Sequence, residues 1–151
     1  MDIHLIAVGR MKTGPAKDIF QDYVKRLHAP LKITEIDIRD QGNDTTPREH
    51  QAIIKALDPS LPIIVLDERG KTMGSMALAD TFRKLIDQSS KTIQIVIGGA
   101  DGLSDEIRAM ARHTISFGAM TWPHMLVRVM LAEQLYRTQQ ILSGHPYHRE
   151  G

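Results

Sequence analysis

Cysteine is absent from this chain of 151 residues. Without thiols the protein cannot form a disulfide framework, a thiolate nucleophile or a cysteine-based zinc site. A strong excess of one charge is missing as well, because the formal net charge is only +1. Proteins that hold nucleic acid through bulk charge are usually strongly basic, so an RNA substrate would require a local patch or two subunits acting together.

Long hydrophobic runs are also lacking. No segment approaches the roughly 18 apolar residues of a membrane span. The segment from Met1 to Gly9 has neither the basic start nor the long apolar centre of a secretory signal peptide. We therefore expect a cytoplasmic protein without membrane contact, folded as a single domain over residues 1–151, since domain sizes peak at about 100–150 residues.

Metal-binding and hydrolase motifs are missing too. The seven histidines include no His-x-x-x-His or His-Glu-x-x-His spacing. His145 and His148 are three residues apart, but Pro146 between them argues against a helical metal face. No Gly-x-Ser-x-Gly elbow occurs, which together with the missing cysteine disfavours a covalent hydrolase. We expect no metal site.

Short apolar runs alternate with longer segments of helical periodicity along the whole chain. The predicted strands are near residues 3–8, 33–40, 63–66, 92–97 and 113–117. The predicted helices begin near residues 15, 46, 75, 104 and 123. This order predicts an α/β fold, a mostly parallel sheet with helices on both faces.

Three polar residues predict where helices begin. Thr46 is followed by Pro47 and, three residues after the threonine, by Glu49, which is the pattern of a capping box. Ser75 and Ser104 are expected to cap the next two helices.

In sheets of this kind ligands bind at the carboxyl ends of the strands. The loops expected there comprise residues 67–74, 98–103 and 118–122. Gly98 and Gly99 would let the backbone approach a ligand closely, although a tight turn without a ligand is equally compatible with them. The pattern is not Gly-x-Gly-x-x-Gly, so a dinucleotide site is not supported. Asp67 and Asp101 could contact a ligand, but loop carboxylates are more often solvated or capping.

The longest predicted helix begins at Pro123 and reaches about Ser143. Its apolar face is broad and needs a packing partner, which can be the sheet alone or a second copy of the chain. Arg128 lies on the more polar side, where a buried salt bridge and a functional role are both compatible with the pattern. The segment from His145 to Arg149 combines an aromatic ring, two histidines and an arginine, which stack on bases and bind phosphates. We interpret this segment as a binding element.

Several segments occur in an order that resembles a known family. They are Ile97 to Ser104, Met120 to Val129, Ala132 to Arg137 and Pro146 to Glu150, with His4 to Gly9 and Leu66 to Lys71 before them. Together they closely resemble the bacterial large-subunit ribosomal RNA pseudouridine-N3 methyltransferases, which belong to the SPOUT class of trefoil-knotted methyltransferases. The resemblance covers nearly the whole chain.

The resemblance implies a SPOUT-like α/β fold with a C-terminal trefoil knot, S-adenosylmethionine as cofactor, and a homodimer. It further implies that the substrate is ribosomal RNA in the large subunit or the whole ribosome. Carried over by position, the cofactor pocket is expected to be lined by Leu66, Gly98, Gly99, Phe117, Gly118, Ala119, Met120, Thr121 and Trp122. Gly118 stands where relatives often carry serine, and Trp122 replaces a smaller leucine or phenylalanine.

The chemistry expected from the resemblance is a one-step methyl transfer to a ring nitrogen, which needs no covalent nucleophile. That nitrogen must lose its proton, so a base or a proton path is required. The candidate catalytic residues are His148 and Arg149, with Tyr147 stacking or donating a hydrogen bond, and Arg128 holding the RNA backbone or the deprotonated base. The alternatives are a Rossmann-type nucleotide enzyme, against which the missing glycine fingerprint counts, and a ribosome assembly factor with a vestigial pocket.

Overall fold

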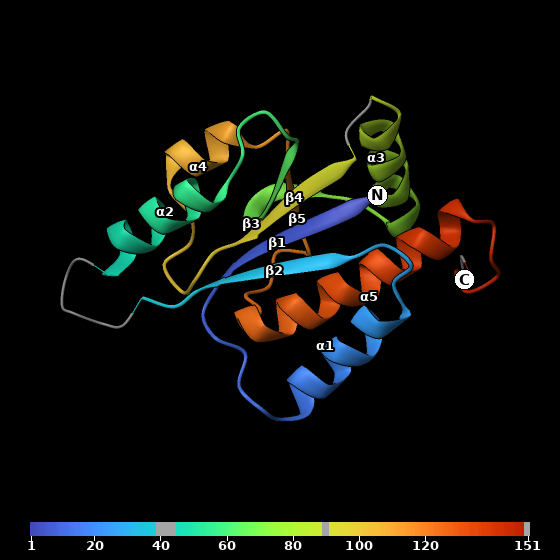
Figure 1. Cartoon of the computed structure of the whole chain (residues 1–151), viewed down its shortest axis with the longest axis horizontal. Coiled ribbons are helices and arrows are strands. Elements are labelled where there is room, and N and C mark those ends of the chain that lie inside the picture. The colour runs from blue at the N-terminus through green and yellow to red at the C-terminus, as the bar shows by residue number, and fades with distance from the viewer. Residues whose placement is uncertain (39–44, 89–90, 150–151) are drawn as a thin grey trace.

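The computed structural model describes residues 1–38, 45–88 and 91–149, and strands alternate with helices throughout (Figure 1). The strands are β1 (Asp2–Val8), β2 (Leu31–Ile36), β3 (Ile63–Thr72), β4 (Thr92–Ile97) and β5 (His113–Ser116). The helices are α1 (Pro15–Arg26), α2 (Thr45–Ala56), α3 (Ser75–Asp87), α4 (Asp105–Met110) and α5 (His124–Leu142).

The five strands form one sheet in the order β2-β1-β4-β3-β5, and every neighbouring pair is parallel. This confirms the predicted α/β class with a parallel sheet. Central parallel strands are covered on both faces and therefore read as nearly continuous apolar runs. In β4 the polar exception is Gln94, which is buried and whose side-chain amide bonds both the N–H and the carbonyl of Asp58 at 2.8 Å.

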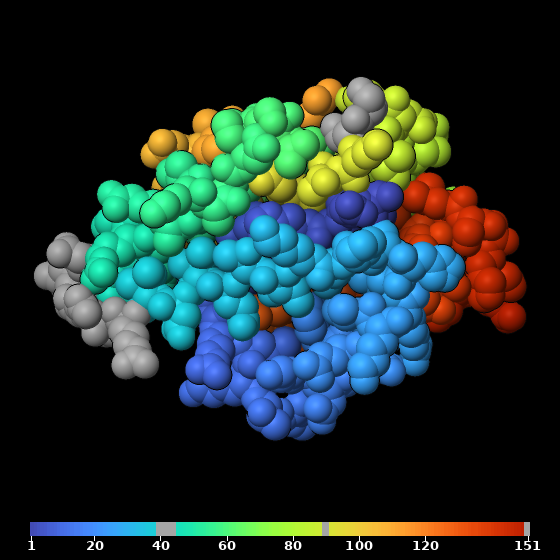
Figure 2. Space-filling model, viewed as in Figure 1, coloured from blue at the N-terminus to red at the C-terminus, as the bar shows by residue number. Residues whose placement is uncertain are grey.

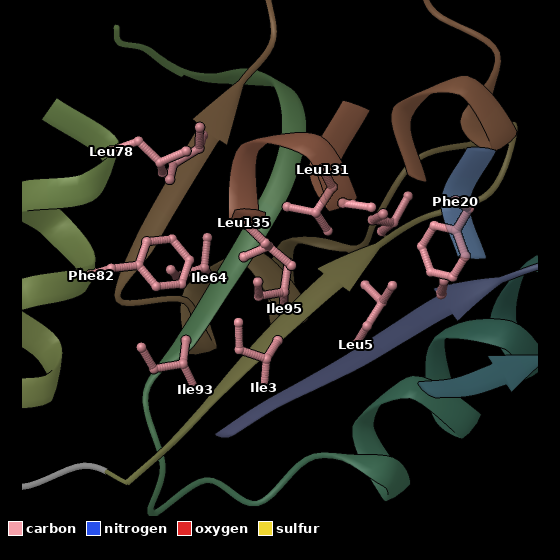
Figure 3. Packing of buried hydrophobic residues seen from close by; sticks show 14 of the residues in the cluster. Ile3, Leu5, Phe20, Ile64, Leu78, Phe82, Ile93, Ile95, Leu131 and Leu135 are labelled. Atoms are coloured by element: carbon pink, nitrogen blue, oxygen red, sulfur yellow. The ribbon is translucent and has the colours of Figure 1, made fainter. Parts of the chain in front are cut away.

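Helices cover both faces of the sheet, as predicted. On one face α1, α3 and α5 pack together through Phe20, Phe82, Leu131 and Leu135 against Ile3, Leu5, Ile64, Ile93 and Ile95 (Figure 3). On the other face α2 and α4 bury Ile53 and Ile107 against Ile6, Val65 and Val96. Two apolar layers therefore hold the strand ends in fixed positions, and these ends carry the candidate site.

The third strand is longer than predicted. Residues 67–72 of the expected loop continue β3 as far as Thr72, and its register against β5 shifts between Leu66 and Lys71. At Gly70 a Cβ atom would lie 2.6 Å from the backbone nitrogen of Ile115. Only glycine lets the two backbones come this close, so Gly70 serves strand pairing at an irregular register and not a loop.

Two of the predicted caps are wrong and one is confirmed. The hydroxyl of Ser104 accepts a hydrogen bond from the N–H of Ile107, as an N-cap does. Thr46 and Ser75 instead lie inside the first turns of α2 and α3, and their hydroxyls donate to side chains elsewhere in the fold. Tertiary partners compete with the local cap for these hydroxyl groups.

The second strand is shorter than predicted. It ends at Ile36, before Ile38, and the predicted end at residues 39–40 lies outside the described residues. The next helix was predicted to begin near residue 46, and Thr45 is already helical. In the part of the chain that is described, no helix is both long and apolar enough to cross a membrane. The C-terminal trefoil knot stays a prediction.

Candidate active site

A cavity of about 760 Å³ lies at the carboxyl ends of β4 and β5 and beside the part of β3 that follows Leu66, where the pairing of β3 with β4 ends. Its lining comprises residues 66–69, 97–103, 115–118 and 120–124, with Arg108 and Val127. The volume is within the range of small-molecule sites, and the location follows the rule for open parallel sheets. The structure thus brings together three strand-end segments that are separated by tens of residues in the sequence.

Eight of the nine residues predicted to bind the cofactor line this cavity: Leu66, Gly98, Gly99, Phe117, Gly118, Met120, Thr121 and Trp122. The ninth, Ala119, is exposed in the same turn and is not part of the lining. Their contact with a cofactor stays a prediction, but their convergence on one cavity is a property of the fold.

The glycine-rich turn after β4 is braced by α2. The N–H of Gly102 donates to the carbonyl of Gly99 at 3.1 Å, which closes the turn. From α2, Thr46 donates to the Asp101 carboxylate at 2.8 Å, and the His50 ring meets the Gly102 carbonyl at 3.2 Å. This bracing holds the turn in one shape beside the cavity.

The segment after β5 supplies apolar surface. Gly118 has φ +117, a conformation that favours glycine, and the Ser116 hydroxyl bonds both its N–H and its carbonyl. Beyond this turn Met120 is 73% exposed and Trp122 is 39% exposed. Exposed large apolar side chains at a cavity wall are suited to pack against a flat ring.

The acidic residues at the cavity are partly engaged within the protein. Asp67 accepts from the N–H of Arg69 at 2.9 Å and lies 3.6 Å from the Arg108 guanidinium. The carboxylate of Asp101, in the glycine-rich turn, accepts from Thr46. Both carboxylates therefore help to shape the cavity wall, and their contact with a ligand stays a prediction.

Several residues around this cavity, among them His124, Arg108 and Glu49, were not singled out as site candidates from the sequence. His124 and Arg108 line it, and Glu49 of α2 lies behind the glycine-rich turn, where its Oε2 would be 3.4 Å from a Cβ at Gly99. Burial raises the pKa of Glu49, and the negative charge of Asp101 adds to this rise, while His50 and His124 oppose it. His124 could have been predicted as a site residue from its position directly after Pro123, because a helix begins there beside a strand-end loop.

Arg128 does not line the cavity. Its side chain is 2% exposed and pairs with Glu35 at 2.6 Å, while its other Nη donates to the carbonyl of Gly9 at 3.1 Å. Partial burial raises the pKa of Glu35, but the N–H of Met11 and the Arg128 guanidinium outweigh it, so the pKa lies below its ordinary value. The structure thus places Arg128 in the buried salt bridge that the sequence left open, and its catalytic role stays a prediction.

The other predicted catalytic residues lie at the opposite end of α5 from the cavity. This helix has 19 residues and is therefore roughly 28 Å long, and the segment of residues 145–149 follows its far end (Figure 1). The space-filling view shows the C-terminal segment at the edge of the molecule remote from α2 (Figure 2). Within one chain Tyr147, His148 and Arg149 are not brought to the cavity.

This C-terminal segment, here called the arm (residues 145–149), is nevertheless ordered against α5. The ring of Tyr147 meets Tyr136 edge-on with centroids 4.7 Å apart, and its hydroxyl donates to Glu133 at 3.3 Å. Burial, reinforced by a hydrogen bond with Tyr23 and the charge of Glu133, raises the pKa of Tyr147 to about 12. Tyr147 therefore stays protonated at neutral pH.

Among the described residues, no group of three histidine or acidic side chains is placed to hold a metal ion.

Comparison with solved structures shows the same fold. A probable methyltransferase from Bordetella pertussis superposes with a TM-score of 0.56 at 14% identity, over 90% of this chain and 95% of that one. A probable methylase family protein from Haemophilus influenzae gives the same TM-score at 11% identity, over 98% of this chain and 70% of that one.

Relatives that match over the full length are much more similar. A protein of Rhodospirillum centenum named ribosomal RNA large subunit methyltransferase H is 48% identical over 151 residues, 99% of each chain. Proteins of the same name from Ruegeria pomeroyi and Rhizorhabdus wittichii are 44% and 42% identical over at least 99% of each chain. The family model described as predicted SPOUT methyltransferase matches residues 1–148. With its parallel sheet and strand-end cavity, this chain belongs to the SPOUT methyltransferase family.

Proposed function

We propose that this protein transfers a methyl group from S-adenosylmethionine to N3 of a pseudouridine in large-subunit ribosomal RNA, as a cytoplasmic homodimer of single-domain subunits. The observation that carries the proposal is the cavity at the strand ends, because eight of the nine residues expected to bind the cofactor line it. The substrate class follows the name of the 48% identical relative, and the pseudouridine target follows the resemblance noted from the sequence.

The residues at the cavity fit S-adenosylmethionine. Leu66, Met120 and Trp122 offer apolar surface for an adenine ring. Gly118 has open space where a side chain would begin and so leaves backbone groups uncovered for the polar atoms of a ligand. At Gly98 the Leu103 side chain occupies that space. When bound, the cofactor would supply an electrophilic methyl group on a sulfonium. The contribution of the protein is then to align that methyl group with the target nitrogen.

A homodimer accounts for the distance between cavity and arm. Since the arm lies about one α5 length from the cavity of its own chain, it can complete only the site of another subunit. Two subunits together also enlarge the surface available for RNA, which a single chain with a net charge of +1 needs. A folded ribosomal surface suits such a protein better than short free RNA does.

Methyl transfer measured on ribosomes that lack the modification tests the function. We expect tritium from labelled S-adenosylmethionine to enter large-subunit RNA, with assembled ribosomes or large subunits preferred over free RNA. Cofactor binding without any transfer would favour the assembly-factor alternative. The double variant H148A/R149A should lose transfer and keep cofactor binding, and unchanged turnover would remove the arm from the mechanism.

Mixing two inactive variants tests the shared site. One variant carries G118V, which blocks the cavity, and the other carries H148A/R149A. If each site uses the partner's arm, mixed dimers regain one site of two, and an equal mixture recovers up to about a quarter of the wild-type rate. No recovery after subunit exchange would show that arm and cavity act within one chain.

A further inference from the structure

The C-terminal arm is held by an ion pair on the last turns of α5. Arg137 donates hydrogen bonds to Oε1 of Glu133 from its Nε at 3.0 Å and from one Nη at 2.5 Å, and both side chains are mostly buried. The guanidinium carbon of Arg137 lies 4.9 Å from the centre of the Tyr147 ring. Tyr147 in turn donates to Glu133, so the pair and the arm form one connected cluster.

The remaining Nη of Arg137 lies 3.0 Å from Nδ1 of His148. An arginine guanidinium has only donors and stays protonated in proteins, so Nδ1 must accept this hydrogen bond. A proton on Nδ1 would set two N–H groups against each other. In this arrangement the imidazole is neutral and carries its proton on Nε2.

Nε2 of His148 is buried and has no hydrogen-bond partner among the described residues. Buried N–H groups are nearly always paired, so an unpaired one indicates an acceptor that lies outside the described chain. The ring as a whole is only partly buried, and the next residue, Arg149, is exposed. A small shift of the arm would open Nε2 to a neighbouring molecule, which can then supply the missing acceptor.

We infer that Arg137, fixed by Glu133, is a positioning residue that holds His148 as a neutral N–H donor toward the target base, and that His148 is not the proton acceptor. The inference rests on the proposed function and assigns a role within it. A pyrimidine-dione ring that loses its N3 proton spreads negative charge over the two flanking carbonyl oxygens. An N–H donor aimed at such an oxygen stabilises the anion and makes N3 the nucleophile.

The step balances without a protein base. N3 gives up its proton to water and then uses its electron pair to bond the methyl carbon. The carbon–sulfur pair stays on sulfur, which becomes a neutral thioether. Tyr147 does not replace His148 as a base, because its raised pKa keeps the hydroxyl protonated.

Substitutions of His148 separate donor from base. In H148Q the side-chain amide can place an N–H near the position of Nε2 but cannot take up a proton. We expect H148A to lower kcat about 100-fold, the loss typical of removing one preorganised donor, while H148Q stays within about tenfold of wild type. Equal losses in H148A and H148Q would overturn the donor role.

Substitutions of Arg137 test positioning. R137Q should lower kcat at unchanged affinity for S-adenosylmethionine, and R137K, which keeps a cationic donor, should recover part of the loss. The control is R83Q, which removes an exposed arginine–carboxylate pair with Asp80 and Asp87 within α3 and should leave turnover unchanged. Full activity of R137Q on ribosomes would refute the inference, whereas an inactive wild-type protein would refute the proposed function.

A spectroscopic measurement needs no activity. Nitrogen NMR of histidine-labelled full-length dimer should show His148 with an unprotonated Nδ1 and a protonated Nε2 at neutral pH, and R137Q should lose this preference. A protonated Nδ1 in the wild-type protein would rule out the assigned tautomer even if methyl transfer proceeds.

Discussion

The buried pair of Arg128 and Glu35 leads to a prediction about stability and its pH dependence. Replacing Glu35 with glutamine keeps the shape and removes the charge. Arg128 is 2% exposed and the side chain of Glu35 is 34% exposed, so the pair is intermediate between a surface and a buried ion pair. Surface pairs contribute about 0–1 kcal/mol, and removing one partner of a fully buried pair costs about 3–5 kcal/mol.

We therefore expect Glu35→Gln to lower the free energy of unfolding by about 2 kcal/mol at pH 7. For a chain of this length that corresponds to a decrease in Tm of roughly 4–8 °C. Urea unfolding followed by circular dichroism, at one fixed protomer concentration, measures the difference. The control is Asp22→Asn, which removes an exposed i,i+4 pair with Arg26 and should cost no more than about 0.5 kcal/mol.

The pH dependence has a defined sign. The pKa of Glu35 is lowered in the folded protein, so its contribution is complete above the unfolded value near 4.5 and is lost as the pH falls through the folded value. The gap between wild type and Glu35→Gln should therefore shrink below about pH 4.5. A gap that widens in acid, or one smaller than about 0.5 kcal/mol at pH 7, would refute the assignment of a charge-stabilised buried pair.

Three further predictions follow from single positions. Gly70→Ala should lower the free energy of unfolding by about 1–3 kcal/mol or more, because its Cβ would collide with the β5 backbone. The control Gly74→Ala, with open space around the added Cβ, should change the free energy of unfolding by less than about 0.5 kcal/mol. Equal effects of the two substitutions would contradict the close approach of the strands. Ser104→Ala should cost about 0.5–2 kcal/mol through loss of the cap on α4, and an unchanged urea midpoint would contradict that role. Trp122 is the single tryptophan of the chain and lines the cavity, so titration with S-adenosylmethionine should change its fluorescence until the site is saturated, whereas NAD should cause no change. A response to NAD but not to S-adenosylmethionine would contradict the proposed ligand of the cavity.

Much of the fold follows from local patterns in the sequence. Apolar runs such as Ile93 to Ile97 predict buried strands because a strand covered on both faces needs apolar side chains on both. The errors occurred where a distant partner overrides the local rule. Ser75 has the position of a cap but bonds Gln134 of α5, and Gly70 has the composition of a loop but lies in a strand against β5.

The candidate site was predicted only in part. The loops after the strands could be located because ligands bind at the carboxyl ends of parallel strands, and the ordered motifs pointed to the same segments. The partner of Arg128 could not be predicted, since Glu35 lies 93 residues away. The position of the arm at the far end of α5 follows from chain order, because the helix begins after the 118–122 loop and the arm follows its last residue. The contacts that hold the arm through Arg137 and Tyr136 could not be predicted from local patterns.

The sequence by itself determined the alternation of strands and helices, the absence of cysteine chemistry and the segments that carry the family resemblance. Each of these properties depends only on residue types and on their spacing over short stretches of the chain. The tertiary structure decided which strand ends meet, since the order β2-β1-β4-β3-β5 includes two pairs, β1 with β4 and β3 with β5, that are not consecutive in the chain. It also decided that Arg128 is buried in a salt bridge and that Arg137 holds the arm. Such contacts depend on packing between distant segments, which no local pattern encodes.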